Sequence, residues 1–171
     1  MELAKEFGFT MHGGMMLNIL NSQALERYLD LGLADACLSF ELPFSEMGTV
    51  LQSKTDGKKT GAVMYGYLPL MKLRACPAKG ENGCGSCTGR SVLTDRIGEC
   101  FTVICREKQY SELLNCVPLY VGDRNLPPLD YGLLYFTTET AEKCRAACEA
   151  YINKRGFPGR KTAGLYFRRL L

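Results

Sequence analysis

Residues 36–40, Ala36-Cys37-Leu38-Ser39-Phe40, form a short stretch that is apolar except for one serine. Such a stretch is typical of a strand buried on both faces, as in a parallel sheet. Amphipathic helices are predicted on both sides of it. One has Ser22 as its predicted N-cap and ends at Gly32, and the other runs from Ser45 through Leu51.

The same alternation extends outward in both directions. Strands are predicted within Thr10–Leu20, at Ala62–Tyr67 and at Leu133–Phe136, and a helix capped by Thr138 or Thr140 follows the last of them. Buried strands that alternate with amphipathic helices indicate βαβ units and a largely parallel sheet. About four units are too few for an eight-stranded barrel. The predicted fold class is therefore α/β with partial TIM-barrel-like units. Such a half-barrel would pair with a second copy or with a missing N-terminal half-barrel.

The chain has 171 residues, which predicts a single domain over 1–171. Its net charge of +3 is too balanced to indicate a nucleic-acid partner by bulk electrostatics. The N-terminus lacks the apolar segment of a signal peptide, and no apolar run reaches the ~20 residues that span a bilayer. We therefore expect a cytoplasmic protein without a membrane segment.

An insertion without core-forming periodicity is predicted at 74–106, rich in Gly, Cys, Lys and Asn. Two short strands are expected at its end, Val92–Asp95 and Phe101–Arg106. Leu68–Met71 is expected to continue the strand before it. The segment Ser111–Val121 fits either a strand or a short helix.

Nine cysteines are many for this length, and an odd number without an export signal argues against disulfides. Four of them, Cys76, Cys84, Cys87 and Cys105, have a spacing that suits one metal centre. The Cys-x2-Cys turn directs two thiolates toward one ion, and glycines beside Cys84 give its backbone the freedom to do so. An all-sulfur set suits Zn²⁺ or an iron–sulfur cluster, and the spacing does not separate them.

Alternatives to this assignment remain open. The four thiols could be free surface groups, and Cys100 and Cys116 compete with Cys105 for the fourth position. Cys37 is predicted as a core residue. Cys144 and Cys148, four residues apart on one helix face, are also predicted to pack in the core, and a position facing the metal site is the alternative for them.

Three polar residues near strand ends are candidate catalytic groups. His12, the only histidine, stands at a strand end, where active-site residues of α/β sheets gather. Asn18 lies in an apolar neighbourhood and needs a hydrogen-bond partner. Glu41 follows a buried strand and is a candidate acid, base or ligand. A satisfied core histidine is the competing explanation for His12, and a surface carboxylate is the competing explanation for Glu41. Tyr65, Asp95 and Arg96 are comparable candidates near the cysteine-rich insertion.

Several phrases of the chain, in this order, resemble the peptidase U32 (collagenase-like) family. They are Leu17-Asn18-Ile19-Leu20-Asn21-Ser22, Leu38-Ser39-Phe40-Glu41-Leu42, Tyr65-Gly66-Tyr67-Leu68-Pro69-Leu70-Met71, Cys76-Pro77, Gly83-Cys84, Leu93-Thr94-Asp95-Arg96, Leu114-Asn115-Cys116-Val117-Pro118-Leu119, Phe136-Thr137-Thr138-Glu139-Thr140 and Thr162-Ala163-Gly164-Leu165-Tyr166.

The resemblance implies a TIM-barrel-like fold of which this chain is the C-terminal half. It also implies that the cysteines hold a [4Fe–4S] cluster, with zinc as the alternative. Relatives support hydroxylation of RNA or of quinone precursors, so the expected function is modification of RNA or of a small aromatic substrate. The family name implies a second function, a peptidase (hydrolase) with a peptide substrate. A non-catalytic, metal-stabilised module is the third.

Overall fold

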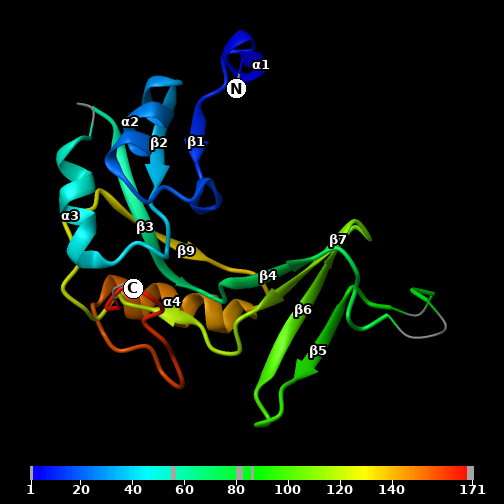
Figure 1. The fold of residues 1–171 in the computed structure, drawn as a ribbon. Helices are drawn as coiled ribbons and strands as arrows, with labels where there is room; N and C mark the ends of the chain where they lie inside the picture. Colours follow the sequence, from blue (N-terminus) through cyan, green and yellow to red (C-terminus); the bar gives the residue numbers. More distant parts are fainter. Residues whose placement is uncertain (1, 55–56, 80–82, 86, 169–171) are drawn as a thin grey trace. The chain divides into compact units, whose positions relative to one another are not determined.

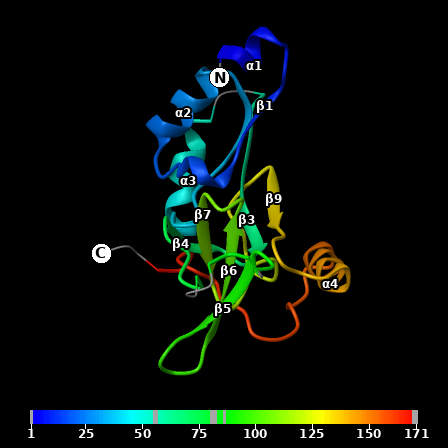
Figure 2. The same cartoon turned by 90° about the vertical axis from the view of Figure 1, so that its right-hand side faces the viewer.

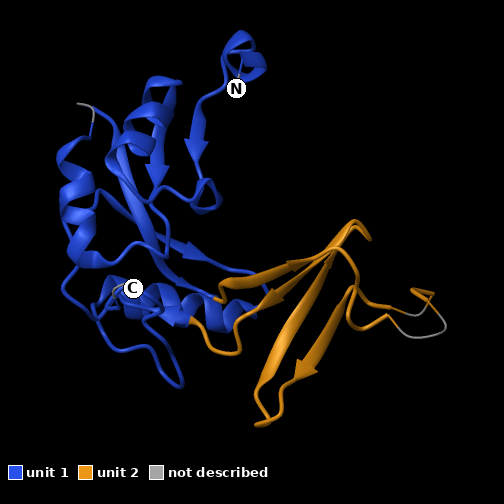
Figure 3. Ribbon diagram, in the orientation of Figure 1, with its two compact units in different colours: residues 1–66, 119–171 blue, residues 67–118 orange. Residues whose placement is uncertain are grey.

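The chain forms two compact units (Figure 3). The first unit comprises residues 1–66 and 119–171, and the second unit comprises residues 67–118. The computed structural model describes residues 2–54, 57–79, 83–85 and 87–168. The insertion predicted at 74–106 lies within the second unit, and its residues 80–82 and 86 lie outside the described residues.

The first unit is built on a mainly parallel sheet (Figure 1). Its parallel strands lie side by side in chain order, and a short antiparallel strand pairs with the end of the third. The parallel strands are β1 (Met11–Gly13), β2 (Leu33–Cys37), β3 (Lys59–Gly66) and β9 (Tyr131–Tyr135), and the antiparallel one is β8 (Leu119–Tyr120).

Helices connect β1 to β2 and β2 to β3, and a helix follows β9, so the predicted α/β class is confirmed. In Figure 2, α2 and α3 lie next to each other, and α2 also packs against β2. The described strands do not close into a barrel. The helical segments are α1 (Glu2–Glu6), the 3-10 turn η1 (Met15–Leu17), α2 (Ser22–Asp30), α3 (Phe44–Gln52) and α4 (Ala141–Ile152).

The helix starts differ from two of the three predicted caps. The N-cap of α2 is Asn21, whose side-chain oxygen accepts the Ala24 N–H at 2.8 Å, and Ser22 is the first helical residue. Helix α3 begins at Phe44 behind Pro43, without a side-chain cap. Thr140 caps α4, one of the two threonines predicted for it. Asn and Ser cap about equally well, so adjacent candidates cannot be ranked from sequence.

Two packing clusters hold the sheet of the first unit. Buried Tyr65 and Tyr120 pack with Ala147 and Ala150 of α4, and Leu134 and Phe157 pack against this cluster. At the other cluster, the ring of Tyr166 stacks on Phe44 at 4.3 Å, and its hydroxyl donates to the Val63 carbonyl at 2.8 Å. Tyr65, a candidate site residue in the sequence, is thus a core residue at 1% exposure.

The second unit is a four-stranded antiparallel sheet with strand order β4-β7-β6-β5. The strands expected near 92–95 and 101–106 are present. Leu68–Met71 does not continue β3 but leads into β4, which belongs to this second sheet. The ambiguous segment 111–121 contributes to two strands, β7 and β8. The strands of the second unit are β4 (Pro69–Leu73), β5 (Arg90–Thr94), β6 (Cys100–Arg106) and β7 (Tyr110–Leu114).

Among the residues described, no helix combines the length and apolar character needed to cross a membrane.

Candidate metal centre

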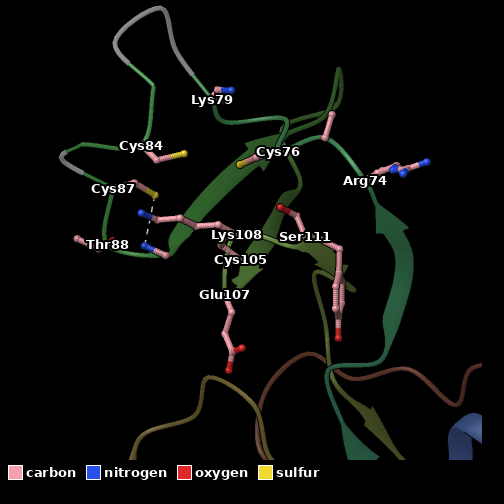
Figure 4. Close-up of a pocket in the computed structure, with 13 residues that line it drawn as sticks. Arg74, Cys76, Lys79, Cys84, Cys87, Thr88, Cys105, Glu107, Lys108 and Ser111 are labelled. Atoms are coloured by element: carbon pink, nitrogen blue, oxygen red, sulfur yellow. Dashed lines mark hydrogen bonds between the residues drawn. The ribbon is translucent and has the colours of Figure 1, made fainter.

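A cavity of about 490 Å³ lies within the second unit, and all four predicted cysteine ligands line it (Figure 4). We call it the cysteine cavity. Cys76 follows β4, Cys84 and Cys87 lie between β4 and β5, and Cys105 lies on β6. In Figure 4 the sulfur atoms of Cys76 and Cys84 point toward one another. Residues from three separate parts of the unit therefore bring thiols to one space.

The Cys84–Cys87 segment has the hydrogen bonds of a metal-binding turn. The Cys87 N–H donates to the Cys84 carbonyl at 3.4 Å, which closes the turn. The Gly89 N–H then donates to the Cys87 sulfur at 3.3 Å. A hydrogen bond of this kind orients a sulfur ligand, as outer-shell partners do at metal sites. The Gly89 carbonyl accepts the Cys105 N–H at 2.8 Å, so this turn is tied to β6.

The two rival cysteines do not line this cavity. Cys100 lies at the opposite end of β6, where its sulfur is 3.7 Å from the Thr94 hydroxyl. The Cys116 thiol donates to the side-chain oxygen of Asn115 at 3.6 Å. Asp95, the other candidate of this region, accepts the Ile97 and Glu99 N–H groups at 2.9 Å each and so forms a turn.

The donor set fits zinc or an iron–sulfur cluster in type and in number, because four thiolates are the usual ligands of both. Within the described residues, no three cysteine, histidine, aspartate or glutamate side chains are placed to hold one ion. The thiols surround the cavity instead of meeting at a point. Their side-chain torsions would have to close around a bound centre, a coupling of binding to local folding that is common for metal sites.

Cationic side chains also line the cysteine cavity: Arg74, Lys79 and Lys108. Four thiolates around a divalent centre carry a net negative charge, which nearby cations offset. Lys108 has φ 62° and its neighbour Glu107 has φ 53°, a backbone conformation that is uncommon for residues other than glycine. Two successive positive φ values are typical of a tight hairpin turn, and the Gln109 N–H closes this one by donating to the Arg106 carbonyl at 2.9 Å. The turn between β6 and β7 therefore places Lys108 at the cavity wall.

His12 lies in the first unit, on β1, with its Nδ1 2.6 Å from the Asp35 carboxylate. The two residues face each other across the β1–β2 ladder. The His12 side chain is 63% exposed, against 21% for Asp35. A cavity of about 340 Å³, which we call the His12 cavity, is lined by both residues and by Tyr131. Sequence reasoning missed Asp35, although an acidic residue inside the otherwise apolar Leu33–Cys37 was a usable signal.

Asn18 and Glu41 are connected to each other through Ser39. The buried Ser39 hydroxyl donates to the Asn18 side-chain oxygen at 2.6 Å and accepts the Glu41 N–H at 3.1 Å. Asn18 has φ 51° and ends the turn η1. The expected partner of Asn18 is therefore Ser39, and the residues that line the His12 cavity include neither Asn18 nor Glu41.

Two of the cysteines outside the cysteine cavity have pKa values raised by burial. Cys37, predicted as a core residue, is 2% exposed, and its burial, helped by the charge of Asp35, raises its pKa to about 12. The pKa of Cys144 on α4 is raised in the same direction by desolvation and then by the charge of Glu139. Raised values keep both thiols protonated and unreactive near neutral pH.

We found no match to this chain among protein-family models, curated proteins or solved structures. The resemblance to the U32 family therefore stays a prediction from the sequence, and the candidate sites rest on their own geometry.

Proposed function

We propose that Cys76, Cys84, Cys87 and Cys105 bind one metal centre, a [4Fe–4S] cluster in preference to Zn²⁺. The proposed function is cluster-supported hydroxylation of RNA or of a small aromatic substrate. The observation that carries the metal centre is that four thiols line one cavity. In the sequence, the first and the last of these cysteines are 29 residues apart. The choice of cluster and the hydroxylation rest on the family resemblance.

Two features of the cysteine cavity support a metal centre over free thiols. The Gly89 N–H donates to the Cys87 sulfur and so orients it, as outer-shell hydrogen bonds orient metal ligands. The cationic groups Lys79 and Lys108 line the same space and would offset the charge of the thiolates.

The arrangement of the first unit supports the partial-barrel part of the proposal. Strands β1, β2, β3 and β9 are parallel and adjacent in chain order, as successive strands of a (βα)8 barrel are. A second copy of the chain, or an N-terminal half-barrel, would complete such a barrel. We propose a cytoplasmic location, because thiols remain reduced there and available to metal.

Anaerobic reconstitution tests the metal centre. The full chain is treated with ferrous iron and sulfide without oxygen, and bound iron, sulfide and the visible spectrum are measured. We expect a brown protein with four iron and four sulfide per chain. A colourless protein with one zinc per chain would show that the site binds zinc and not a cluster. A protein that retains neither metal would refute the metal centre.

Single substitutions test the ligand set. Cys87→Ser and Cys105→Ser should each lose most of the bound metal. Cys100→Ser and Cys116→Ser are matched controls in the same unit, outside the cavity, and should keep it. Equal retention by all four variants, or loss only in the controls, would contradict the assignment.

Mass spectrometry of cellular RNA tests the reaction. Deletion of the gene should remove a nucleoside that carries one additional oxygen atom, and the wild-type gene should restore it where Cys87→Ser does not. RNA without any change points to the small aromatic substrate, whose hydroxylated product should disappear from extracts of the deletion strain instead. If neither RNA nor metabolites lose a hydroxylated species, the hydroxylation proposal is wrong.

A further inference from the structure

The imidazole of His12 is held by a single carboxylate in a defined orientation. Its Nδ1 lies 2.6 Å from Asp35 Oδ2, and the two residues are paired across adjacent strands. A carboxylate at this distance keeps a proton on Nδ1, so the neutral ring has its lone pair on Nε2. Because the His12 side chain is 63% exposed, this nitrogen is accessible from solvent.

Tyr131 forms a second wall beside this pair. Its hydroxyl lies 3.5 Å from the other Asp35 oxygen, Oδ1. Its ring packs directly on Gly61, where a Cβ would overlap the ring atoms. Burial is the main cause that raises the Tyr131 pKa, so the phenol stays neutral. The backbone of β3 thus fixes an uncharged aromatic wall next to the carboxylate.

The remaining walls of the His12 cavity are largely apolar, with Cys37 and Leu133 among them. A thiol beside a histidine could suggest a cysteine nucleophile. The pKa of Cys37, raised to about 12 by burial and by the charge of Asp35, argues against this, because the thiolate is the reactive form. The imidazole is therefore the candidate base of this cavity.

We propose that the His12 cavity is a general-base site, in which His12 Nε2 removes a proton from a compact, largely apolar molecule with an acidic O–H or C–H group. Asp35 acts as a positioning residue, because it fixes the tautomer and stabilises the imidazolium that forms. All residues of this site belong to the first unit, so the site is independent of the cysteine centre.

A compact benzisoxazole is a direct probe of such a base. With 5-nitrobenzisoxazole, Nε2 takes the proton from the ring C–H, and the electron pair of that bond completes a C≡N triple bond. The ring N–O bond breaks, and its electron pair remains on oxygen as a coloured nitrophenolate. The imidazolium then releases its proton to water, so the reaction needs no oxidant, reductant or co-reactant.

The experiment compares initial rates of nitrophenolate release by the full-length variants. His12→Ala should lose about 10²-fold or more in kcat/KM, in the range of general-base catalysis. Asp35→Asn should lower kcat about tenfold with little change in KM, since it alters the base and not the apolar walls. Asp30→Asn, the same chemical change at an exposed position on α2, should match the wild type. A rate unchanged in His12→Ala, or an Asp35→Asn rate equal to that of Asp30→Asn, would overturn the proposal.

Chemical modification keeps the test decisive if His12→Ala does not fold. His12 is the only histidine of the chain, so diethyl pyrocarbonate has one imidazole to modify. Complete modification of the wild type should abolish the activity, and hydroxylamine should restore it. Activity that survives complete modification would refute the site. Cys87→Ser should retain the wild-type rate, which separates this proposal from the metal centre.

Discussion

Gly61 occupies a position where no larger residue fits without movement of its neighbours. A Cβ there would lie within 2.5 Å of the Tyr131 ring, on the strand pair β3–β9. We expect Gly61→Ala to destabilise the protein by about 1–3 kcal/mol, the usual cost of overpacking. It should also lower the nitrophenolate rate, because Tyr131 is displaced from its place beside Asp35.

A double-mutant cycle in urea denaturation checks the cause. If the added methyl group acts by contact with the Tyr131 ring, Gly61→Ala should cost much less in a Tyr131→Ala background than in the wild type. Additive effects of the two substitutions would show that the cost has another origin.

The buried thiol of Cys37 predicts a dependence of stability on pH. Its pKa is raised from 9.0 to about 12 in the folded chain, so the folded state favours the protonated thiol. This contribution is fully present below the unfolded value and is lost as pH rises from about 9 toward 12. The free energy of unfolding should therefore fall between about pH 8 and pH 10.

Urea denaturation at the two pH values measures this effect. Cys37→Ala should show a smaller fall than the wild type, and Cys100→Ala, which removes an exposed thiol, should show the wild-type fall. If all three proteins lose equal stability, Cys37 is not responsible for the dependence.

At the level of residues, sequence patterns identified groups whose chemistry depends on local spacing. The Cys84–Cys87 turn is such a case, because the turn itself directs both thiols, and these two residues do line one cavity with Cys76 and Cys105. Asp35 and Tyr131 meet only through strand register, at a separation of 96 residues. No local pattern encodes such a register, which is why this pair was missed.

Among the elements, helix α2 provides a test of which side chain caps it. Asn21 accepts the Ala24 N–H, whereas Ser22 is already helical. Asn21→Ala should therefore cost about 1 kcal/mol of stability, the typical value of an N-cap, and Ser22→Ala should cost a few tenths at most. Thermal or urea unfolding of the two variants distinguishes them, and the reverse order would assign the cap to Ser22.

The loop between β6 and β7 predicts a substitution that stabilises. Lys108 has φ 62°, a conformation that glycine adopts without the clash of a Cβ. The left-handed conformation costs an L residue about 1–2 kcal/mol, and the extra chain entropy of glycine costs about 0.5–1 kcal/mol. Lys108→Gly should therefore raise the free energy of unfolding by about 0.5–1 kcal/mol. Gln109→Gly is the neighbouring control and should not stabilise, since Gln109 is not among the residues with positive φ.

The same variant separates stability from function at the cysteine cavity. If the cation of Lys108 offsets thiolate charge, Lys108→Gly should be more stable without metal and yet release its metal more readily to a chelator. If the variant is more stable and retains its metal as well as the wild type does, Lys108 does not contribute to the metal centre.

Helices and strands were predictable where the period of apolar residues was clear. Which strands pair with one another was not predictable. The segment from Ala62 to Met71 reads as one apolar run, but the chain divides it between β3 and β4, which belong to different sheets. Gly66 marks the division. Its φ is 153°, and a Cβ at this position would lie 2.5 Å from the Tyr135 carbonyl oxygen. A local reading of hydrophobicity cannot detect that a chain leaves one sheet for another.

At the scale of the whole molecule, the second unit begins and ends at neighbouring positions of the first. Gly66 at the end of β3 pairs with Leu119 at the start of β8, in antiparallel register. Replacement of residues 67–118 by a two-residue Asn-Gly turn should therefore leave the first unit folded, since such turns join antiparallel strands.

Circular dichroism, urea denaturation and the nitrophenolate rate check this replacement. The shortened chain should unfold cooperatively, keep the activity of the His12 cavity and bind no metal. Loss of the folded state would show that the first unit depends on the second for its stability. Retention of metal would contradict the placement of the metal centre.

The pairing of β3 with β9 has a consequence for the rate at which the first unit forms. These strands are joined through residues 67–118, so their contact closes a long loop, with an entropy cost that grows with loop length. Within the second unit, the Asn115 N–H donates to the Leu68 carbonyl at 2.9 Å, which joins the two ends of that loop. If the second unit folds early, β3 and β9 have a shorter effective loop to close before they pair. A substitution confined to the second unit can therefore slow the refolding of the sheet of the first unit.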